Sequence, residues 1–131
     1  MPLSGGFMNI EYLKAVAETG NLDAQYQLGC IYADGEIVKR NYLEAMKWWG
    51  SSAIQGHIGS HFKLGEIYHF GLGIDSVDYE KAIKLYLIPA TNGMAQACYN
   101  IGNCYTHLDD FYQASIWYTV AYSLGGDSNP G

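Results

Sequence analysis

Ser60-His61-Phe62-Lys63 has the spacing of a chemical motif, because a serine followed three residues later by a lysine is the S-x-x-K nucleophile pattern of penicillin-interacting enzymes. Those enzymes also carry S-D-N and K-T-G motifs, and neither tripeptide occurs in this sequence. Two matching residues arise readily by chance in a chain of 131 residues. We therefore interpret the stretch as ordinary helix and keep an enzyme that uses Ser60 or a histidine only as the minor alternative.

Histidines and carboxylates occur at spacings that metal sites use, but each set lacks a required partner. His57 and His61 are four residues apart, and the residues between them lack the glutamate of a zinc-peptidase helix. Glu66 and His69 have the spacing of a di-iron ligand pair, which needs a second such pair and two further carboxylates. No second pair stands in register, so we expect no metal site.

The remaining polar clusters also favour structural roles. His107 precedes Asp109 and Asp110 at an expected turn, where an aspartate most often caps the next helix. Gly71-Leu72-Gly73 is too short for a phosphate-binding loop, and no G-K-[ST] helix start follows it. We therefore predict a protein that is not an enzyme and that holds no metal and no cofactor.

The dominant feature of the chain is an internal repeat with a period of 36 to 37 residues. One phrase, apolar-Gly-x-x-Tyr, occurs as Leu28-Gly29-x-x-Tyr32, Leu64-Gly65-x-x-Tyr68 and Ile101-Gly102-x-x-Tyr105. A second phrase follows it each time, as Ala45-x-x-Trp48-Trp49, Ala82-x-x-Leu85-Tyr86 and Ala114-x-x-Trp117-Tyr118. Periods of this length are typical of stacked helical pairs, whose function lies on an extended surface.

Apolar residues recur every three or four positions within each repeat, which is the spacing of one helical face. We predict seven helices: Met8 to Thr19, Leu22 to Ala33, Tyr42 to Gln55, Ile58 to Phe70, Tyr79 to Thr91, Ala95 to Thr106 and Asp110 to Leu124. Asn41 with Glu44 and Asp110 with Gln113 fit capping boxes, and Asp78 fits a plain N-cap. Glycines should end the second helices in a left-handed conformation: Gly20, Gly56, Gly93 and Gly125.

By length the chain is one domain, which we divide by repeat register. The parts are a half repeat at 8–20, repeats at 21–56 and 57–93, a shortened repeat at 94–125 and a tail at 126–131. The repeat glycines Gly29, Gly65 and Gly102 are expected where the two helices of one repeat approach each other closely, which would offset their low helix propensity of about 1 kcal/mol each.

Composition limits the partners and the location. The chain has 13 acidic and 7 basic residues, so its net charge of −6 repels phosphate backbones and anionic lipid surfaces. We therefore expect neither nucleic acid nor membrane as a partner. No stretch reaches the ~20 apolar residues of a membrane span, and residues 1–11 lack the pattern of a secretory signal, so we expect a cytoplasmic protein. Three cysteines, Cys30, Cys98 and Cys104, are an odd number and are expected as free thiols.

The repeated phrases resemble the Sel-1-like repeat, a relative of the tetratricopeptide repeat. They are Ala24-x3-Leu28-Gly29-x2-Tyr32-x2-Gly35, Asn41-x2-Glu44-Ala45-x2-Trp48-Trp49-x3-Ala53-x2-Gly56, Gly71-x-Gly73-Ile74 and Asp78-Tyr79-Glu80-Lys81-Ala82. The resemblance implies an all-α, right-handed α/α solenoid of antiparallel helix pairs that serves as a scaffold or adaptor for protein partners. The second connector has one extra residue, and the third repeat is short enough to look like a tetratricopeptide motif proper.

The resemblance also brings two alternatives. Some cysteine-rich relatives in bacterial envelopes tie each helix pair with a disulfide and have been linked to penicillin binding, whereas no repeat of this chain contains that cysteine pair. A hydrolase of that penicillin-interacting type is one alternative function. A purely structural oligomerisation module is the other.

In tetratricopeptide-like stacks, the first helices of the pairs line a concave groove, and the repeat register assigns residues of this chain to it. The expected protein-binding residues are Tyr26, Phe62, Glu66, His69, Tyr99, Asn103 and His107. Three aromatic residues in one column suit the docking of an extended peptide or a partner helix. The alternative is that this column only packs neighbouring first helices together.

The last helix lacks the polar outer face that the end of a solenoid needs. No residue from Phe111 to Leu124 is charged, and five are aromatic: Phe111, Tyr112, Trp117, Tyr118 and Tyr122. We expect self-association, as a homodimer through this helix, or docking of a partner there. The alternatives are that the tail covers the apolar patch or that the patch is tolerated in water.

Overall fold

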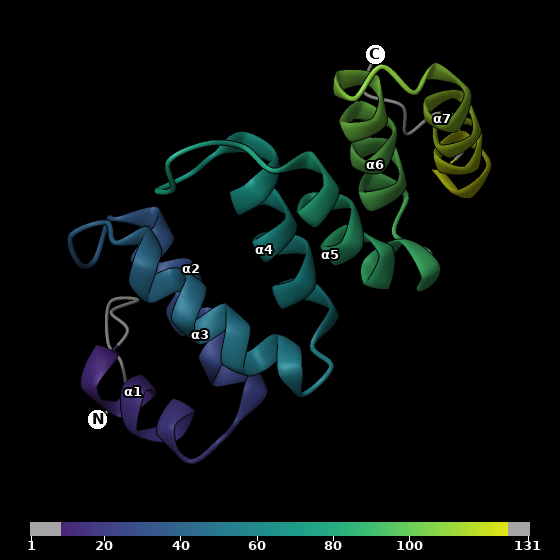
Figure 1. Cartoon of the computed structure of the whole chain (residues 1–131). Coiled ribbons are helices and arrows are strands. Elements are labelled where there is room, and N and C mark those ends of the chain that lie inside the picture. The colour runs from purple at the N-terminus through teal and green to yellow at the C-terminus, as the bar shows by residue number, and fades with distance from the viewer. Residues whose placement is uncertain (1–8, 126–131) are drawn as a thin grey trace. The chain divides into compact units, whose positions relative to one another are not determined.

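The computed structural model describes residues 9–125, and within them the chain forms seven helices (Figure 1). They are α1 (Ile10–Glu18), α2 (Leu22–Asp34), α3 (Tyr42–Ile54), α4 (Ile58–Phe70), α5 (Tyr79–Thr91), α6 (Ala95–His107) and α7 (Phe111–Gly125). Each lies within two residues of its predicted bounds, except that the predicted first residue, Met8, lies outside the described part, as does the tail at 126–131. No strand occurs in residues 9–125.

The chain divides into two compact units. Unit 1 ends at Ser60 and contains α1, α2, α3 and the first turn of α4. Helix α2 packs against α3, and α1 packs against α2. The core of this unit comes from all three helices: Leu13, Ala17, Ala24, Leu28 and Trp48. The half repeat at α1 thus buries its apolar face on the first helix of the following repeat.

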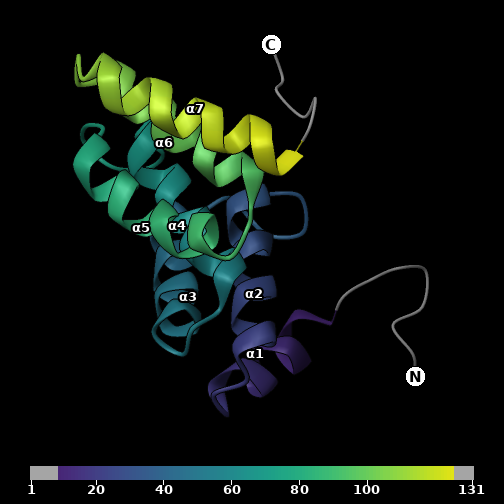
Figure 2. The ribbon, with the colours of Figure 1, turned by 90° about the vertical axis from the view of Figure 1, so that its right-hand side faces the viewer.

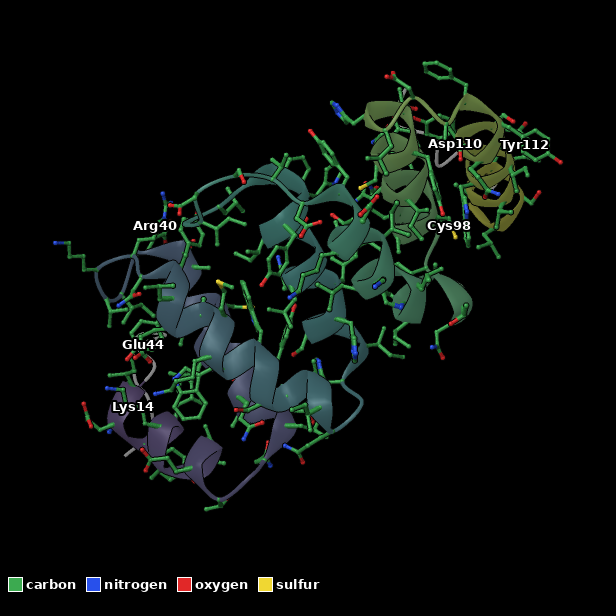
Figure 3. The ribbon with its side chains drawn as sticks, viewed as in Figure 1. Lys14, Arg40, Glu44, Cys98, Asp110 and Tyr112 are labelled. Carbon is green, nitrogen blue, oxygen red and sulfur yellow. The ribbon has the colours of Figure 1, made fainter. Side chains whose placement is uncertain are left out.

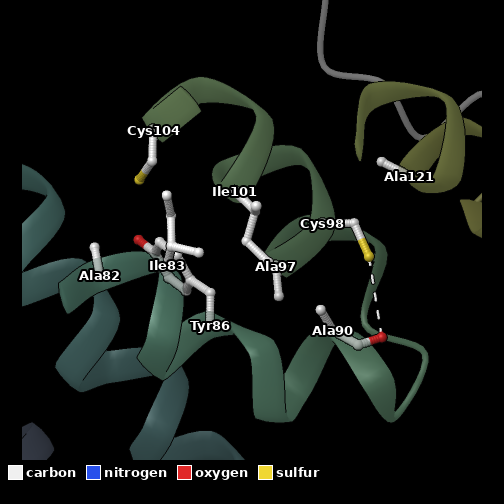
Figure 4. Packing of buried hydrophobic residues seen from close by; sticks show 9 residues of the cluster. All are labelled: Ala82, Ile83, Tyr86, Ala90, Ala97, Cys98, Ile101, Cys104 and Ala121. Carbon is white, nitrogen blue, oxygen red and sulfur yellow. Dashed lines mark hydrogen bonds between the residues drawn. The ribbon is translucent and has the colours of Figure 1, made fainter. Parts of the chain in front are cut away.

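Unit 2 begins at His61 and contains the rest of α4 with α5, α6 and α7. Helix α6 packs against both α5 and α7, and Figure 2 shows α7 running alongside α6. The core lies mainly between α5 and α6, where Tyr86, Ile101 and Cys104 are fully buried (Figure 4). Helix α6 is therefore the central element of this unit.

In each repeat, the glycine of the first helix faces an aromatic ring of the second helix. A methyl group added at Gly29, Gly65 or Gly102 would lie 2.5 to 2.6 Å from the ring of Trp49, Tyr86 or Tyr118, respectively. Real side chains do not approach so closely, so only glycine leaves room for the ring. The expected close approach is confirmed, and what approaches the glycine is the ring rather than the helix backbone.

The same backbone hydrogen bond closes the connector of each repeat. The backbone N–H groups of Asn41, Asp78 and Asp110 donate to the carbonyl oxygens of Tyr32, Tyr68 and Tyr105 at 2.9 Å in all three repeats. The side chains of the same three donors accept from the backbone N–H three residues later, as the predicted N-caps should. The three connectors differ in length but end with the same backbone hydrogen bond and the same N-cap. The short third connector therefore leaves the helix pair intact.

Three of the four predicted helix-ending glycines are left-handed. Gly20, Gly56 and Gly93 have φ values of 102°, 97° and 90°. The prediction is wrong for Gly125, which is the last helical residue of α7 and has no positive φ. The first connectors begin at left-handed glycines, Gly35 and Gly71, whereas the third turns at Asp109 with a φ of 62°. An aspartate adopts this conformation at a cost that glycine does not have.

Replacing Gly65 by alanine should destabilise the protein by about 1 to 2 kcal/mol, because overpacking against the buried Tyr86 ring outweighs the gain in helix propensity. The matched control is Gly50→Ala in α3, where an added methyl group meets nothing within 4 Å and should stabilise by up to about 1 kcal/mol. Urea unfolding of the two variants measures both changes. Equal stability of the two would contradict the ring contact.

Replacing Asp109 by glycine should stabilise unit 2 by about 0.5 to 1 kcal/mol, because glycine takes the left-handed conformation without steric cost. The control is Asp110→Gly, which removes the side-chain cap of α7 and should destabilise by about 1 kcal/mol. Thermal unfolding compares the neighbouring changes. A lower melting temperature for the Asp109 variant would show that its carboxylate has a role beyond the turn.

Candidate functional site

The three aromatic residues of the expected groove column are each half-buried, and each packs one side against another ring. Tyr26 packs on His57 with ring centres 4.7 Å apart, in unit 1. In unit 2, Phe62 packs on Tyr86 at 5.5 Å. The third, Tyr99, also lies in unit 2, and its ring centre is 5.4 Å from that of Tyr118. In unit 2, these rings are held by the second helix of their own repeat and remain partly accessible.

A hydrogen bond from Tyr118 orients the side chain of Asn103. The Tyr118 hydroxyl donates to Asn103 Oδ1 at 2.6 Å and lies 3.1 Å from the hydroxyl of Thr106. Because the oxygen of the amide faces Tyr118, its NH₂ group faces the other way, and Asn103 is half-buried. Glu66, also half-buried, lies 3.6 Å from Lys63 one helical turn earlier.

His69 is buried, in contrast to its expected exposure in the groove. Only 5% of the residue is exposed, and Nδ1 lies 2.9 Å from the Tyr86 hydroxyl. Its ring stacks on exposed Phe70 at 4.1 Å and meets Tyr79 edge-on. Burial, and to a smaller extent the like charge of His107, lower the pKa of His69 to about 4. The imidazole is therefore neutral at pH 7 and belongs to the packing of the helix pair.

His107 is exposed, as expected for a groove residue. Its ring stacks almost parallel on that of Tyr79, with centres 4.6 Å apart and planes 3° apart. Since Tyr79 also contacts His69, the two histidines of the expected site adjoin one tyrosine at the start of α5. The structure thus brings His69 and His107 together, with one imidazole buried and the other accessible.

Ser60, His57 and Asp23 form a line that resembles a catalytic triad, but its geometry is that of a helix cap. The Ser60 hydroxyl lies 3.2 Å from His57 Nδ1, and His57 Nε2 lies 3.3 Å from Asp23 Oδ1. The backbone N–H of Ser60 donates to the same His57 nitrogen at 3.0 Å, which makes His57 the N-cap of α4. Ser60 is 0% exposed, so a substrate carbonyl has no access to its hydroxyl.

The aromatic residues of α7 fall into two groups. Phe111, Tyr112 and Tyr122 are 63%, 75% and 60% exposed, and Figure 3 shows Tyr112 on the outer side of the helix. Trp117 and Tyr118 are half-buried, and Trp117 packs on the core between α5 and α6. Of the residues expected on the association surface, Phe111, Tyr112 and Tyr122 are therefore exposed. The other two, Trp117 and Tyr118, pack within unit 2.

A depression that the sequence did not predict lies in unit 2 between α5 and the junction of α6 with α7. It has a volume of about 610 Å³ and is lined by Glu80, Ile83, Lys84, Leu87, Tyr105, Leu108 and Asp110. The third connector, which is the short one, joins Tyr105 to Asp110 on its rim. The shortened repeat was visible in the sequence, but the hollow beside it depends on how α5 and α6 pack.

Cys30, Cys98 and Cys104 are free cysteines in the structure. Cys98 and Cys104 are fully buried, and burial raises the pKa of both thiols, that of Cys104 to about 12. Figure 4 shows Cys98 directed at the carbonyl oxygen of Ala90, 4.0 Å from its sulfur. These two thiols are small apolar core residues and are not activated nucleophiles.

Within 9–125, no three His, Cys, Asp or Glu side chains gather as a metal site would need. In the same part of the chain, no helix has the length and apolar character to cross a membrane.

Comparison with protein families assigns the repeat. The Sel1 repeat family matches residues 22–57, 59–93 and 95–126, which together make up more than half of the chain. The chain belongs to the Sel1 repeat family. The third match includes the shortened repeat, which is therefore also a Sel1 repeat, and the expectation of a tetratricopeptide motif proper is wrong there.

Curated relatives share this repeat over part of their length. The chain is 29% identical over 98 residues to an ERAD-associated E3 ubiquitin-protein ligase component, HRD3B, of Arabidopsis thaliana. It is 32% identical over 96 residues to protein sel-1 homolog 2 of Rattus norvegicus. These matches cover 74% and 70% of this chain, but only 15% and 14% of the relatives. The chain thus spans about one seventh of each relative's length.

Solved structures confirm the fold class. A Sel1 repeat protein from Oxalobacter formigenes matches with a TM-score of 0.77 and 28% identity, over 88% of this chain and 48% of its own. A protective antigen of uropathogenic Escherichia coli strains, which displays an SLR fold, matches with a TM-score of 0.79 and 32% identity, over 90% and 26%. The chain is therefore an all-α protein of the tetratricopeptide-like solenoid class, a class generally used for protein–protein interaction.

Acid should destabilise this Sel1 repeat protein through His69. Its folded pKa of about 4 lies below the ordinary 6.5, so the unfolded chain binds the proton first as the pH falls. This contribution is complete above about pH 6.5 and is lost towards about pH 4, a change of about 3 kcal/mol. Urea unfolding between these pH values, with His69→Gln for comparison, isolates it.

NMR titration of the His69 ring provides the direct control. In the His107→Gln variant the pKa of His69 should rise, because one of the two causes that lower it is removed. A His69 ring that titrates near pH 6.5 in the folded protein would contradict its burial.

Proposed function

We propose that this chain is a non-catalytic interaction module that binds a segment of a partner protein, as an extended peptide or a helix, through side chains of its first helices. The supporting observation is that Tyr26, Phe62 and Tyr99 occupy one repeat position, are each half-exposed and are each backed by another ring. A backed ring offers apolar area and loses little rotamer freedom on binding. That combination suits recognition of a partner better than an isolated mobile side chain.

Polar groups beside these rings would give the interaction its selectivity. Glu66, Asn103 and His107 are accessible in whole or in part, and each differs in charge or hydrogen-bonding character. His69 is not part of this surface in the proposal, because its imidazole is buried against Tyr86. The family relationship supports a protein partner, since Sel1 repeats generally serve as interaction modules.

Three further features belong to the proposal. We propose a cytoplasmic location, which three free cysteines support because reducing compartments keep thiols unpaired. The half repeat and three repeats are proposed to act as one domain. Oligomerisation is the second candidate function, and the exposed aromatic face of α7 favours it.

The test compares two triple variants that each remove three accessible apolar side chains. Tyr26, Phe62 and Tyr99 are replaced by alanine in one; the control replaces Tyr12, Leu43 and Ile54, which are 65%, 69% and 89% exposed. Peptides selected on the wild-type chain from a displayed library serve as probes, and calorimetry measures binding. The first variant should bind at least about tenfold more weakly, and the control should bind like the wild type.

Because the aromatic rings also pack on their neighbours, a milder pair, Phe62→Leu with Tyr99→Leu, keeps most of the volume and guards against unfolding. Melting temperatures are measured for every variant. Unchanged affinity in folded variants of both kinds would reject the proposed surface.

A further inference from the structure

In the repeat register, the outer face of α7 corresponds to the face through which the second helix of a repeat packs against the first helix of the next repeat. Aligned on Ala82 and Ala114, the α5 residues Ile83, Leu87 and Ala90 correspond to Ser115, Thr119 and Tyr122 of α7. This α5 face packs in the core against α6, where Ile83 and Ala90 are 7% and 6% exposed. Their counterparts in α7 are exposed. Within residues 9–125, a surface of α7 that stands in the register of a helix–helix contact is therefore exposed.

The composition of this face suits close contact with another helix. Its centre consists of Ser115 and Thr119, whose hydroxyls donate to carbonyl oxygens of their own helix at 2.8 Å, so their main hydrogen bonds would survive burial. Aromatic residues stand on either side, with Tyr112 at 75% and Tyr122 at 60% exposure. Small residues in the middle let two helix axes approach, and the flanking rings supply the apolar area.

The absence of charged residues in α7 favours an uncharged helix as its partner. Helix α7 contains no Asp, Glu, Lys or Arg, whereas the whole chain has a net charge of −6. Two copies repel each other over most of their surfaces, and contact through an uncharged helix places no like charges at the interface. A strongly charged partner would find no counter-charge on this face.

The order of residues along α7 is self-complementary. If two copies cross antiparallel at position 117, Ser115 lies opposite the second copy's Thr119, and Tyr112 lies opposite the second copy's Tyr122. Each small residue then meets a small residue, and each ring meets a ring, as a two-fold interface requires. We propose that the chain self-associates as a two-fold dimer through antiparallel α7 helices. This inference concerns the oligomerisation candidate and does not depend on peptide binding by the first helices.

Sedimentation of the purified chain, without any peptide, tests the dimer from about 1 μM to about 500 μM, the range in which small interfaces dissociate. The dissociation constant should rise at least about tenfold in Tyr122→Lys, because the lysine places a charge in the apolar contact. The matched control is Ile54→Lys, which introduces the same charge at an 89% exposed apolar residue of α3 and should leave the dimer unchanged. Circular dichroism confirms that both variants are folded.

A cross-linking experiment tests the antiparallel register. Ser115→Cys and Thr119→Cys chains, mixed under oxidising conditions, should form the mixed disulfide dimer in preference to either like pair. Ser51→Cys is the control, because Ser51 is an exposed α3 residue whose hydroxyl also donates to its own helix. Ser51→Cys chains should not cross-link in this way.

Three results would overturn the proposal. One is a monomer over the whole concentration range, and another is a dimer that Tyr122→Lys leaves intact, which would place the interface elsewhere. The third is growth beyond the dimer, since a two-fold contact closes on itself. Loss of peptide binding in the first-helix variants with an intact dimer would leave this inference standing, so the two proposals fail separately.

Discussion

The contact between a glycine of the first helix and an aromatic ring of the second helix holds each repeat together. Without a side chain at Gly29, Gly65 and Gly102, the rings of Trp49, Tyr86 and Tyr118 lie against the first helix. The glycines lower helix propensity by about 1 kcal/mol each, and the buried ring surface offsets this cost. The same contact between glycine and ring recurs in all three repeats.

This constraint explains why the connectors can differ in length. Once the ring fixes the helix pair, the connector has only to join Tyr32, Tyr68 or Tyr105 to the cap of the second helix. One backbone hydrogen bond at 2.9 Å does so in all three repeats. The extra residue in the second connector and the missing residues in the third therefore change the surface around the pair and leave the pair itself intact. The depression beside the third connector is one such surface change.

The sequence predicted the helices well because their signals are local. Apolar spacing, the caps at Asn41, Asp78 and Asp110, and the left-handed glycines all lie within one or two turns of the helix end that they determine. The family relationship was equally accessible, since whole phrases recur in register. The prediction for the third repeat is wrong because a shorter connector does not change the type of repeat, which still matches the Sel1 family.

Burial at the candidate site was harder to predict, because it depends on contacts between helices. His69 stands four residues after Gly65 and His107 five residues after Gly102, and one is buried against Tyr86 whereas the other is exposed on Tyr79. The repeat register assigned both positions to the groove and did not predict which of them is buried. A signal that could have predicted the burial of His69 is the aromatic residue four positions after Ala45, Ala82 and Ala114. This residue recurs in all three repeats as Trp49, Tyr86 and Tyr118, and its polar group needs a hydrogen-bond partner when it is buried.

Each of these rings satisfies its polar group through the first helix of its own repeat, and the partner differs every time. The Trp49 indole donates to the carbonyl oxygen of Tyr26 at 3.2 Å, the Tyr86 hydroxyl pairs with His69, and the Tyr118 hydroxyl donates to Asn103. Backbone, imidazole and amide thus hold one ring position in three ways. In the second and third repeats, this hydrogen bond holds a side chain of the first helix, His69 or Asn103, in one orientation. The repeat therefore maintains a common core while varying which first-helix side chains are rigidly held, and such variation lets a regular array present a different surface at each repeat.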